Sequence, residues 1–517
     1  MVKKYFVQLL FLFITALCYA QAPQVLWDKY FGGQGGEAIS IEKTADGGFI
    51  IAGTAQNAHE DAVNFVNGPD VFVVKVNANF DKEWSYCYGG QYYESPSKII
   101  QTSDGGYAFA ATKSIAGASF NVWVVKLNTA GQVSWEYNFG GSNEDWASDI
   151  VETASGDLVV SGWSRSSNGD VLLNKGLGDY WILRLNQNGI KQQSFTYGGT
   201  DDDNATSLVV NPDGTMIVAG ETFSENNNVT CRNPSTCESD FWLIKLSETG
   251  IILWAKCFGS VYSGTNFFNR PEAIIRTNDN GYMIVGYGRD NSVQNSFGGF
   301  DFWAIKIDDN GNLQWKKNYG GQGDDRAYSV RQTIDGGYVI AGSSWSNDGQ
   351  VLVDFASTYL SSLQNGWVIK VDGNGNLEWQ KAIGGDFSVD YLNDLVEISD
   401  GEFAAIGRPG LESNNHTANS AGRRFWIVRL SQNAMSTNTP GLKSLSVYPV
   451  PVGNTLHIDS GQEVKKVSVC DISGRNIFTV SAQNITEIST VNLMPGIYNV
   501  IIDTDTGAAV KKITKGL

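Results

Sequence analysis

Carboxylates are the residues of this chain most able to do chemistry, because its 517 residues include 54 Asp and Glu but only three His. Acid runs such as Asp201-Asp-Asp203 could serve glycoside hydrolysis, which uses a pair of carboxyl groups. The histidines are His59, His416 and His457, and no metal-binding His spacing, nucleophile elbow, phosphate-binding loop or Cys/His cluster accompanies them. Acid runs alone are too common in this chain to be specific, so the sequence assigns no catalytic residue and no metal ligand.

The overall acidity narrows the range of partners. A formal net charge of -17 opposes binding to nucleic acid phosphates and suits a protein that works outside the cell. Calcium is the one cofactor left open, since Asp308-Asp-Asn-Gly-Asn312 has the spacing of acidic ligands in a calcium loop. The final Glu of an EF-hand is missing there, so a tight turn is the better interpretation, and no cofactor is expected.

A base and an acid recur at fixed places along the chain. Seven bases end a short apolar run: Lys75, Lys126, Arg184, Lys245, Lys306, Lys370 and Arg429. An acid stands ten positions before a turn Asp or its equivalent: Glu94, Asp145, Asp203, Asp325 and Asp390. Because a charge buried between neighbouring sheets needs a partner, we expect these bases and acids to form structural ion pairs within or between repeats. A ring of acids that binds cations at the mouth of a pore is the alternative.

The cysteines match no metal-binding pattern. Cys231 and Cys237 bracket five residues of one variable loop, and we expect them to form a disulfide that stiffens it. Cys87 and Cys257 stand at equivalent positions of different repeats, and we expect both to be small buried hydrophobic side chains.

One phrase, repeated seven times, supplies the elements that position these residues. Its clearest copy runs Trp315-Lys-Lys-Asn-Tyr-Gly-Gly321, Thr333-Ile-Asp-Gly-Gly-Tyr-Val-Ile-Ala-Gly342 and Gly366-Trp-Val-Ile-Lys370. Each repeat offers four short strands rich in β-branched and aromatic residues, bounded by Gly, Asn and Asp turns. Four antiparallel strands per repeat are typical of a propeller blade. We therefore predict an all-β protein, with a seven-bladed β-propeller over residues 21–435 and a small β-sandwich after it.

The order of the pieces predicts how the ring closes. Residues 25–31 have the pattern of a fourth strand, whereas the seventh repeat stops after its third strand near Leu430. An open ring would leave unpaired strand edges. We expect the N-terminal strand to complete the last blade.

Unequal loops between the second and third strands are where we expect recognition. They span roughly 54–69, 163–178, 222–239, 287–300, 343–365 and 408–424 and are rich in aromatic and amide side chains. We assign four of their aromatic residues to ligand binding: Trp163, Phe223, Trp345 and Tyr359. A binding protein should show a shallow aromatic surface without a pair of acids of perturbed pKa, whereas a hydrolase needs two carboxylates that converge on one pocket.

The two ends of the chain carry targeting signals. Lys3 and Lys4 precede an apolar stretch, so residues 1–20 are predicted to be a signal peptide, and no other segment has the pattern of a transmembrane helix. A linker over 436–444 leads to residues 445–517, which contain three phrases in a set order. Their residues are Tyr448, Pro449 and Pro451, then Gly474 and Arg475, then Gly496 and Tyr498, followed by the terminal Lys511 and Lys512.

This order resembles the type A C-terminal sorting domain of type IX secretion cargo, although Val450 stands where that family usually has Asn. The resemblance implies that the type IX machinery is a partner. It also implies that the protein is secreted or attached to the outer-membrane surface, after removal of both the signal peptide and the C-terminal domain. We expect a monomeric, non-catalytic propeller that binds a glycan or a protein partner. A secreted propeller hydrolase that acts on polysaccharide through loop carboxylates is the alternative.

Overall fold

The computed structural model describes residues 22–33, 35–115, 119–232, 238–259, 268–289, 298–352, 364–384, 389–410, 425–432, 446–448, 452–460, 463–471, 476–504 and 507–515. Strands, turns and loops make up all of these residues, with no helix among them. They form two compact units, one over 22–431 and one in the C-terminal part. Within the described ranges, no helix is present that could span a membrane.

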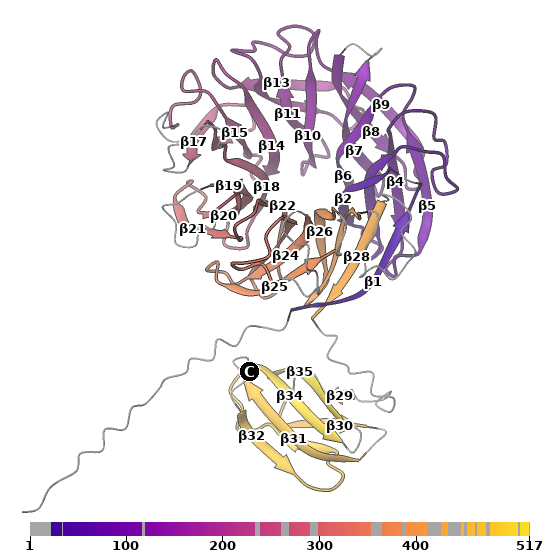
Figure 1. The fold of residues 1–517 in the computed structure, drawn as a ribbon, viewed down its shortest axis with the longest axis vertical. Coiled ribbons are helices and arrows are strands. Elements are labelled where there is room, and N and C mark those ends of the chain that lie inside the picture. The colour runs from indigo at the N-terminus through magenta and orange to yellow at the C-terminus, as the bar shows by residue number, and fades with distance from the viewer. Residues whose placement is uncertain are drawn as a thin grey trace, which may run out of the picture. The chain divides into compact units, whose positions relative to one another are not determined.

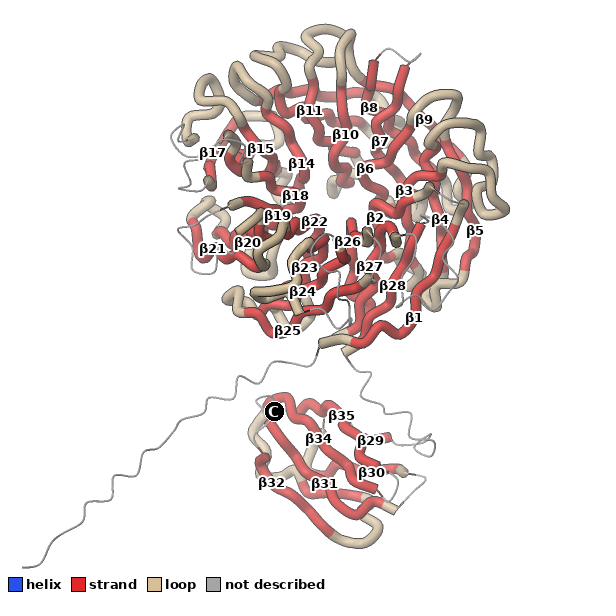
Figure 2. The backbone as a smooth tube through the Cα atoms, viewed as in Figure 1, coloured by secondary structure: helices blue, strands red, loops and turns tan. Residues whose placement is uncertain are grey.

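Seven four-stranded antiparallel sheets form a ring of blades, as predicted (Figures 1 and 2). Blade 1 comprises β2 (Glu37–Lys43), β3 (Phe49–Ala55), β4 (Asp70–Val76) and β5 (Lys82–Tyr88). Blade 2 comprises β6 (Glu94–Gln101), β7 (Tyr107–Ile115), β8 (Ser119–Leu127) and β9 (Val133–Phe139). Blade 3 comprises β10 (Asp145–Glu152), β11 (Leu158–Ser164), β12 (Asp179–Leu185) and β13 (Lys191–Tyr197). Blade 4 comprises β14 (Asp203–Val210), β15 (Met216–Thr222), β16 (Asp240–Leu246) and β17 (Ile252–Phe258). Blade 5 comprises β18 (Arg270–Arg276), β19 (Tyr282–Gly288), β20 (Asp301–Ile307) and β21 (Leu313–Tyr319). Blade 6 comprises β22 (Asp325–Gln332), β23 (Tyr338–Ser344), β24 (Asn365–Val371) and β25 (Leu377–Ile383). Blade 7 comprises β26 (Tyr391–Ser399), β27 (Glu402–Arg408), β28 (Phe425–Ser431) and the N-terminal β1 (Gln24–Phe31).

The N-terminal strand closes the ring, which confirms the predicted closure. β1 pairs antiparallel with β28, from Gln24 opposite Ser431 to Phe31 opposite Phe425. Lys29 of β1 also donates to the Phe80 carbonyl of blade 1 at 3.0 Å. Figure 1 shows the two ends of this unit side by side in blade 7, so no strand edge is left open at the closure.

Large aromatic side chains fill the spaces between the blades. The tryptophan of the third strand is fully buried in five blades: Trp181, Trp242, Trp303, Trp367 and Trp426. Tyr180 of blade 3 reaches across to blade 4, where its hydroxyl donates to the Trp242 carbonyl at 2.9 Å. Each such ring removes about 150–250 Å² from water, which makes the aromatic positions the main source of cohesion between blades.

The C-terminal unit consists of two small sheets. One contains β29 (Ser446–Tyr448), β30 (Thr455–Asp459) and β33 (Glu487–Ser489). The other has the order β32 (Asn476–Ser481), β31 (Val464–Asp471), β34 (Gly496–Thr504) and β35 (Gly507–Lys515). Alternate residues such as Val467, Val469 and Val500 are buried between them.

The sorting phrases fall on these strands. Tyr498 is buried at the start of β34 and donates its hydroxyl to the Met494 carbonyl at 2.8 Å, whereas Tyr448 on β29 is exposed. Gly496 begins β34, and Lys511 and Lys512 lie on β35. The remaining phrase residues, Pro449, Pro451, Gly474 and Arg475, lie outside the described residues.

Candidate functional site

The recurring bases form ion pairs, but not with the acids that the sequence pattern suggested. Six of the seven bases pair with an acid of their own blade's hairpin turn or strand start: Lys75 with Asp46 (2.8 Å), Lys126 with Asp104 (2.7 Å), Arg184 with Asp157 (3.0 Å), Lys306 with Asp279 (2.8 Å), Lys370 with Asp335 (3.0 Å) and Arg429 with Glu402 (2.9 Å). Lys245 instead pairs with Asp309 of the next blade at 2.6 Å. Pairs within and between blades therefore both occur, as expected, with different acids.

Strand register explains why the predicted partners are wrong. In blade 3, Asp145 lies level with Ser164 and Asp179 at one end of the sheet. Arg184 lies level with Val159 at the other end. The two levels are five residues apart along β12, which is about 17 Å at the rise of a β-strand, so the acid and the base cannot meet.

The recurring acids are buried at the opposite end of each blade and hold its loops. Asp203 is fully buried, and its carboxylate accepts hydrogen bonds from the Thr222 hydroxyl, the Ser224 hydroxyl (2.9 Å) and the Gly199 amide (2.7 Å). Asp145 and Asp325 repeat this arrangement with Ser166 (3.0 Å) and Ser346 (2.8 Å). These acids are structural supports of the face that carries the long loops, here called the loop face.

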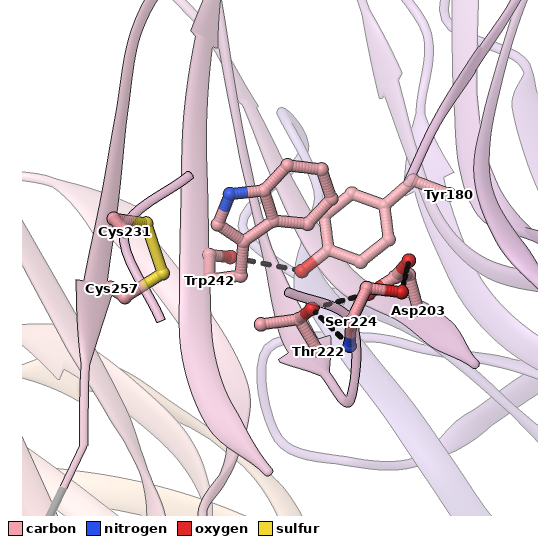
Figure 3. Close-up of a disulfide and its surroundings, with 7 residues drawn as sticks. All are labelled: Tyr180, Asp203, Thr222, Ser224, Cys231, Trp242 and Cys257. Carbon is pink, nitrogen blue, oxygen red and sulfur yellow. Dashed lines mark hydrogen bonds between the residues drawn. A yellow bond between two sulfur atoms is a disulfide. The ribbon is translucent and has the colours of Figure 1, made fainter. Parts of the chain in front are cut away.

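A disulfide joins Cys231 to Cys257, with 5.4 Å between the Cα atoms, so the expected bond from Cys231 to Cys237 is wrong (Figure 3). Cys257 on β17 lies opposite Trp242 on β16, and the loop that contains Cys231 leads into β16. The outer strand is therefore within reach of the loop, which sequence spacing does not reveal. Cys87 is a free, buried cysteine as predicted, whereas Cys257 is not, and Cys237 lies outside the described residues.

The long loops of blades 3, 4 and 6 begin with the same turn. A buried serine two residues beyond the second strand is followed five residues later by a buried valine, and the three pairs are Ser166 and Val171, Ser224 and Val229, and Ser346 and Val351. The residue just before the serine is free to vary and differs among the blades: Arg165, Phe223 or Trp345. A common turn thus presents a different side chain from each of these blades.

An open depression of about 410 Å³ lies on the loop face between blades 3 and 4. Leu177, Asp201, Asp202, Phe223 and Glu238 line it. Phe223 is half-buried, and its backbone amide donates to the Asp202 carbonyl at 3.0 Å. This hydrogen bond joins the loop that contains Phe223 to the segment that contains Asp202. This depression brings the predicted binding residue Phe223 together with the acid run at 201–203.

Trp163 lies beside this depression. A Cβ on Gly178 would lie 2.9 Å from Asp202 Oδ1 and 3.5 Å from the Trp163 ring, so all three meet at the end of the β11–β12 loop. Arg165 bonds Asp202 at 3.2 Å and lies over the Trp163 ring at 5.5 Å, while Trp146 stacks on that ring with centroids 5.7 Å apart. The site is therefore an aromatic and acidic surface shared by two blades.

The other two predicted binding residues do not join this site. Trp345 belongs to blade 6, where the Arg326 guanidinium lies 5.4 Å from its ring centroid and 5.1 Å from that of Tyr287. Tyr359 lies outside the described residues. The pattern of single aromatic residues did not reveal the acidic members Asp202 and Glu238, nor Leu177, because their proximity depends on how two blades pack.

Acids of raised pKa are present, contrary to what we expect of a binding protein, and three of them lie buried at the loop face. Desolvation raises the pKa of Asp179, Asp203 and Asp325 to about 6 in each case. All three side chains are fully buried. They lie beneath the glycine corners of the loop face and cannot contact a ligand in the depression.

A second depression, of about 470 Å³, lies between blades 1 and 2. Its lining includes Tyr86, Lys113, Trp123 and Glu136. The Trp123 ring is covered by the Lys113 ammonium at 4.1 Å, and its indole donates to Glu136 at 3.0 Å. These side chains satisfy one another, so the depression between blades 3 and 4 is the stronger candidate.

Comparison with known proteins defines the class. Residues 446–515 match the family model described as a secretion system C-terminal sorting domain. The chain is thus a β-propeller followed by a type IX sorting domain, which makes it a cargo of that secretion system. No curated protein matches it.

Several solved structures resemble this chain weakly and at low identity. The Pan2 WD40 domain of Neurospora crassa has 11% identity and a TM-score of 0.45, with 80% of this chain and 96% of that one covered. A protein of unknown function from Dyadobacter fermentans has 9% identity and a TM-score of 0.39, covering 79% and 99%. An α-L-arabinofuranosidase from Fusarium graminearum, in complex with an iminosugar inhibitor, has 10% identity and a TM-score of 0.37, covering 66% and 92%. Neither ligand nor activity follows from likenesses this weak.

Proposed function

We propose that this protein is a non-catalytic, extracellular binding protein whose depression between blades 3 and 4 takes a glycan. The observation that carries the proposal is one open depression that combines apolar Phe223 and Leu177 with the carboxylates of Asp201, Asp202 and Glu238. Sugar rings present apolar C–H faces that pack on apolar or aromatic side chains, and hydroxyl groups that donate to carboxylates.

The charge of the site narrows the ligand class. Three carboxylates line the depression, of which Asp202 is paired with Arg165, and the chain as a whole carries a formal net charge of -17. Uronic acids and sulfated sugars would be repelled. Neutral glycans and glycans with free amines therefore fit best.

Binding without hydrolysis is favoured by where the perturbed acids lie. A glycosidase needs a carboxylic acid of raised pKa beside the scissile bond. The acids of raised pKa described above are fully buried and out of reach of a ligand. A hydrolase that uses Asp201, Asp202 and Glu238 remains the second candidate, because three carboxylates share one depression.

The sorting domain sends the protein to the extracellular or cell-surface space. We further propose that the leader at residues 1–20 and the C-terminal domain are both removed during export. The propeller would then act as a monomer, either free or attached to the outer-membrane surface. It needs no cofactor for binding of this kind.

A glycan array probed with the full-length chain, run beside a polysaccharide hydrolysis screen, tests the proposal. We expect retention of a set of neutral or amine-bearing glycans without release of reducing ends. Phe223→Ala should lose this retention, whereas Tyr137→Ala, which removes an exposed aromatic ring from the outer strand of blade 2, should keep it. Release of sugar ends that depends on Asp202 would establish the hydrolase instead, and retention unchanged in Phe223→Ala would exclude this depression.

A further inference from the structure

Two buried carboxyl groups meet beneath the depression, at the corner between blades 3 and 4. A Cβ on Gly198 would lie 2.0 Å from Asp179 Oδ1 and 2.6 Å from Asp203 Oδ2. Both acids are fully buried. Their oxygens thus converge on a residue that has no side chain, and a second negative charge there would repel the first.

The hydrogen bonds of the pair leave one oxygen without a donor. Asp203 receives three donors: the hydroxyl groups of Thr222 and Ser224, drawn in Figure 3, and the Gly199 amide. Asp179 Oδ2 accepts from the Lys175 amide at 2.5 Å, but Asp179 Oδ1 is buried and has no hydrogen-bond partner. An unpaired buried carboxylate oxygen is costly, and a proton on it would turn it into a donor toward Asp203.

Two other corners of the ring repeat the acid pair, with Asp70 and Glu94 at Gly89 and Asp301 and Asp325 at Gly320, and two more carry an amide in place of one acid. At the blade 2–3 corner, Asn121 stands in the place of Asp179, and its Nδ2 and Asp145 Oδ2 lie 3.1 and 2.4 Å from the Cβ position of Gly140. At the blade 6–7 corner, Asn365 and Asp390 converge in the same way on Gly384. An amide is a neutral group with a donor, as is a protonated carboxyl group. The same backbone thus accepts one charged and one neutral member.

We propose that Asp179 and Asp203 share one proton, held between Asp179 Oδ1 and Asp203 Oδ2, and that this proton keeps the depression above them in its binding form. The proton comes from solvent and returns to it, and no bond between heavy atoms changes. A divalent cation fits less well, because it would need about six to eight oxygen ligands. In the described part of the chain, no third His, Cys, Asp or Glu completes a metal site.

The pair is linked directly to the walls of the depression. Asp179 holds the Lys175 amide, two residues before Leu177, and the Gly178 carbonyl accepts from the Asp203 amide at 2.6 Å. Ser224, bound to Asp203, is next to Phe223. Repulsion between two charged carboxylates would therefore act on both walls.

The charged groups around the pair set the direction of the pH effect. Lys175, from the loop, is the cation that faces Asp179, but its ammonium donates to Asn228. On the side of Asp203, Glu221 is neutralised by Arg270 at 2.8 Å, and the Tyr180 hydroxyl donates to Trp242. Desolvation raises the pKa of both Asp179 and Asp203 to about 6.

A raised folded-state pKa means that folding takes up a proton. The stabilisation is fully present below the unfolded pKa of about 4 and is lost as the pH rises through about 6. We therefore expect the thermal midpoint of the full-length chain to fall between pH 5 and pH 7.5. Asp179→Asn should make this fall smaller, and Asn121→Asp, which builds a new acid pair, should make it larger. Glu60→Gln, at an exposed site, should follow the wild type.

Two further measurements test the shared proton and its effect on ligand binding separately. An infrared band of a protonated carboxylic acid should be present at pH 5.5 and should be reduced in Asp179→Asn. With a glycan found on the array, wild-type affinity should fall about tenfold from pH 5.5 to 7.5, whereas Asp179→Asn should lose this dependence. This second part rests on the proposed function. If no glycan binds, the midpoint profiles and the band still test the shared proton, and identical profiles in wild type, Asp179→Asn and Asn121→Asp would overturn it.

Discussion

Removing the turn acid from one of these ion pairs should destabilise the protein, because it leaves a buried ammonium without its charged partner. The pair in blade 5 is the most suitable one for testing this. The Lys306 side chain is 3% exposed, and its ammonium bonds Asp279 at 2.8 Å and Gln314 at 2.9 Å. Breaking a buried ion pair costs about 3–5 kcal/mol. The Asp279 side chain is 53% exposed, so solvent screening reduces the expected cost of Asp279→Asn to about 2 kcal/mol.

Asparagine is the right replacement because it isolates the charge. The Gly281 amide and the Thr277 hydroxyl donate to Asp279 Oδ1, and an asparagine Oδ1 can still accept both. Denaturant unfolding followed by tryptophan fluorescence measures the change in the free energy of unfolding. A double-mutant cycle of Asp279→Asn with Lys306→Met gives the coupling energy of the pair, which should also be about 2 kcal/mol.

The turn of blade 4 is a matched control. Asp213 occupies the same turn position, but Lys245 of that blade bonds Asp309 instead. Asp213→Asn should change stability by less than about 0.5 kcal/mol. A coupling below about 0.5 kcal/mol in blade 5, or equal losses in the two blades, would refute the reasoning.

The stability contributed by the pair of Asp279 and Lys306 depends on pH in the opposite direction to that contributed by the buried acids Asp179 and Asp203. Burial alone would raise the pKa of Asp279, but the hydrogen bonds from Lys306, Thr277 and the Gly281 amide and the charge of Lys306 together outweigh it and lower the pKa to about 2. A depressed folded-state pKa gives stability that is present above the unfolded pKa and lost as the pH falls from about 4 to about 2. Asp279→Asn should remove this part of the acid sensitivity.

Three further predictions concern closure, the disulfide and export. Deletion of residues 22–31 should abolish cooperative unfolding of the propeller and promote aggregation, because it exposes the edge of β28; a sharp, wild-type melting transition would contradict this. Peptide mapping without reductant should find Cys231 joined to Cys257, and Cys257→Ser should lower the thermal midpoint; a native peptide that links Cys231 to any other cysteine would show this pairing to be wrong. Deletion of residues 446–515 should leave the protein inside the cell envelope, with immunoblots of medium and cell surface as the measurement.

Most of the fold was predictable because it depends on short-range patterns. Strand alternation, turn chemistry and a repeat that stops near Leu430 were enough to predict seven blades and closure by β1. The same applies to the sorting domain, whose phrases are contiguous in sequence.

Pairings between distant residues were harder to predict. We expected the bases to pair with the acids that stand ten positions before the turns, such as Asp203, whereas the turn acids, such as Asp279, are their partners. The disulfide was mispredicted because Cys257 approaches Cys231 only once β17 pairs with β16. Register and neighbouring strands decide such contacts, and spacing along the chain does not report them.

The candidate site was also only partly predictable, because contacts between different loops form it. Two of the four aromatic residues that we assigned to binding lie at the candidate site, since Phe223 lines the depression and Trp163 lies beside it. Glu238 and Leu177 carry no signal of their own in the sequence. They join the site only because the loops of blades 3 and 4 lie together.

Hydrogen exchange on the full-length chain tests the central claim, that recognition takes place in the depression between blades 3 and 4. Exchange would be compared with and without a glycan selected from the array. The account predicts slower exchange in the two loops that form the walls, residues 165–178 and 222–232, with little change in the loop of blade 1 at 56–69. Protection confined to other blades, or bound glycan without protection of either wall, would contradict it.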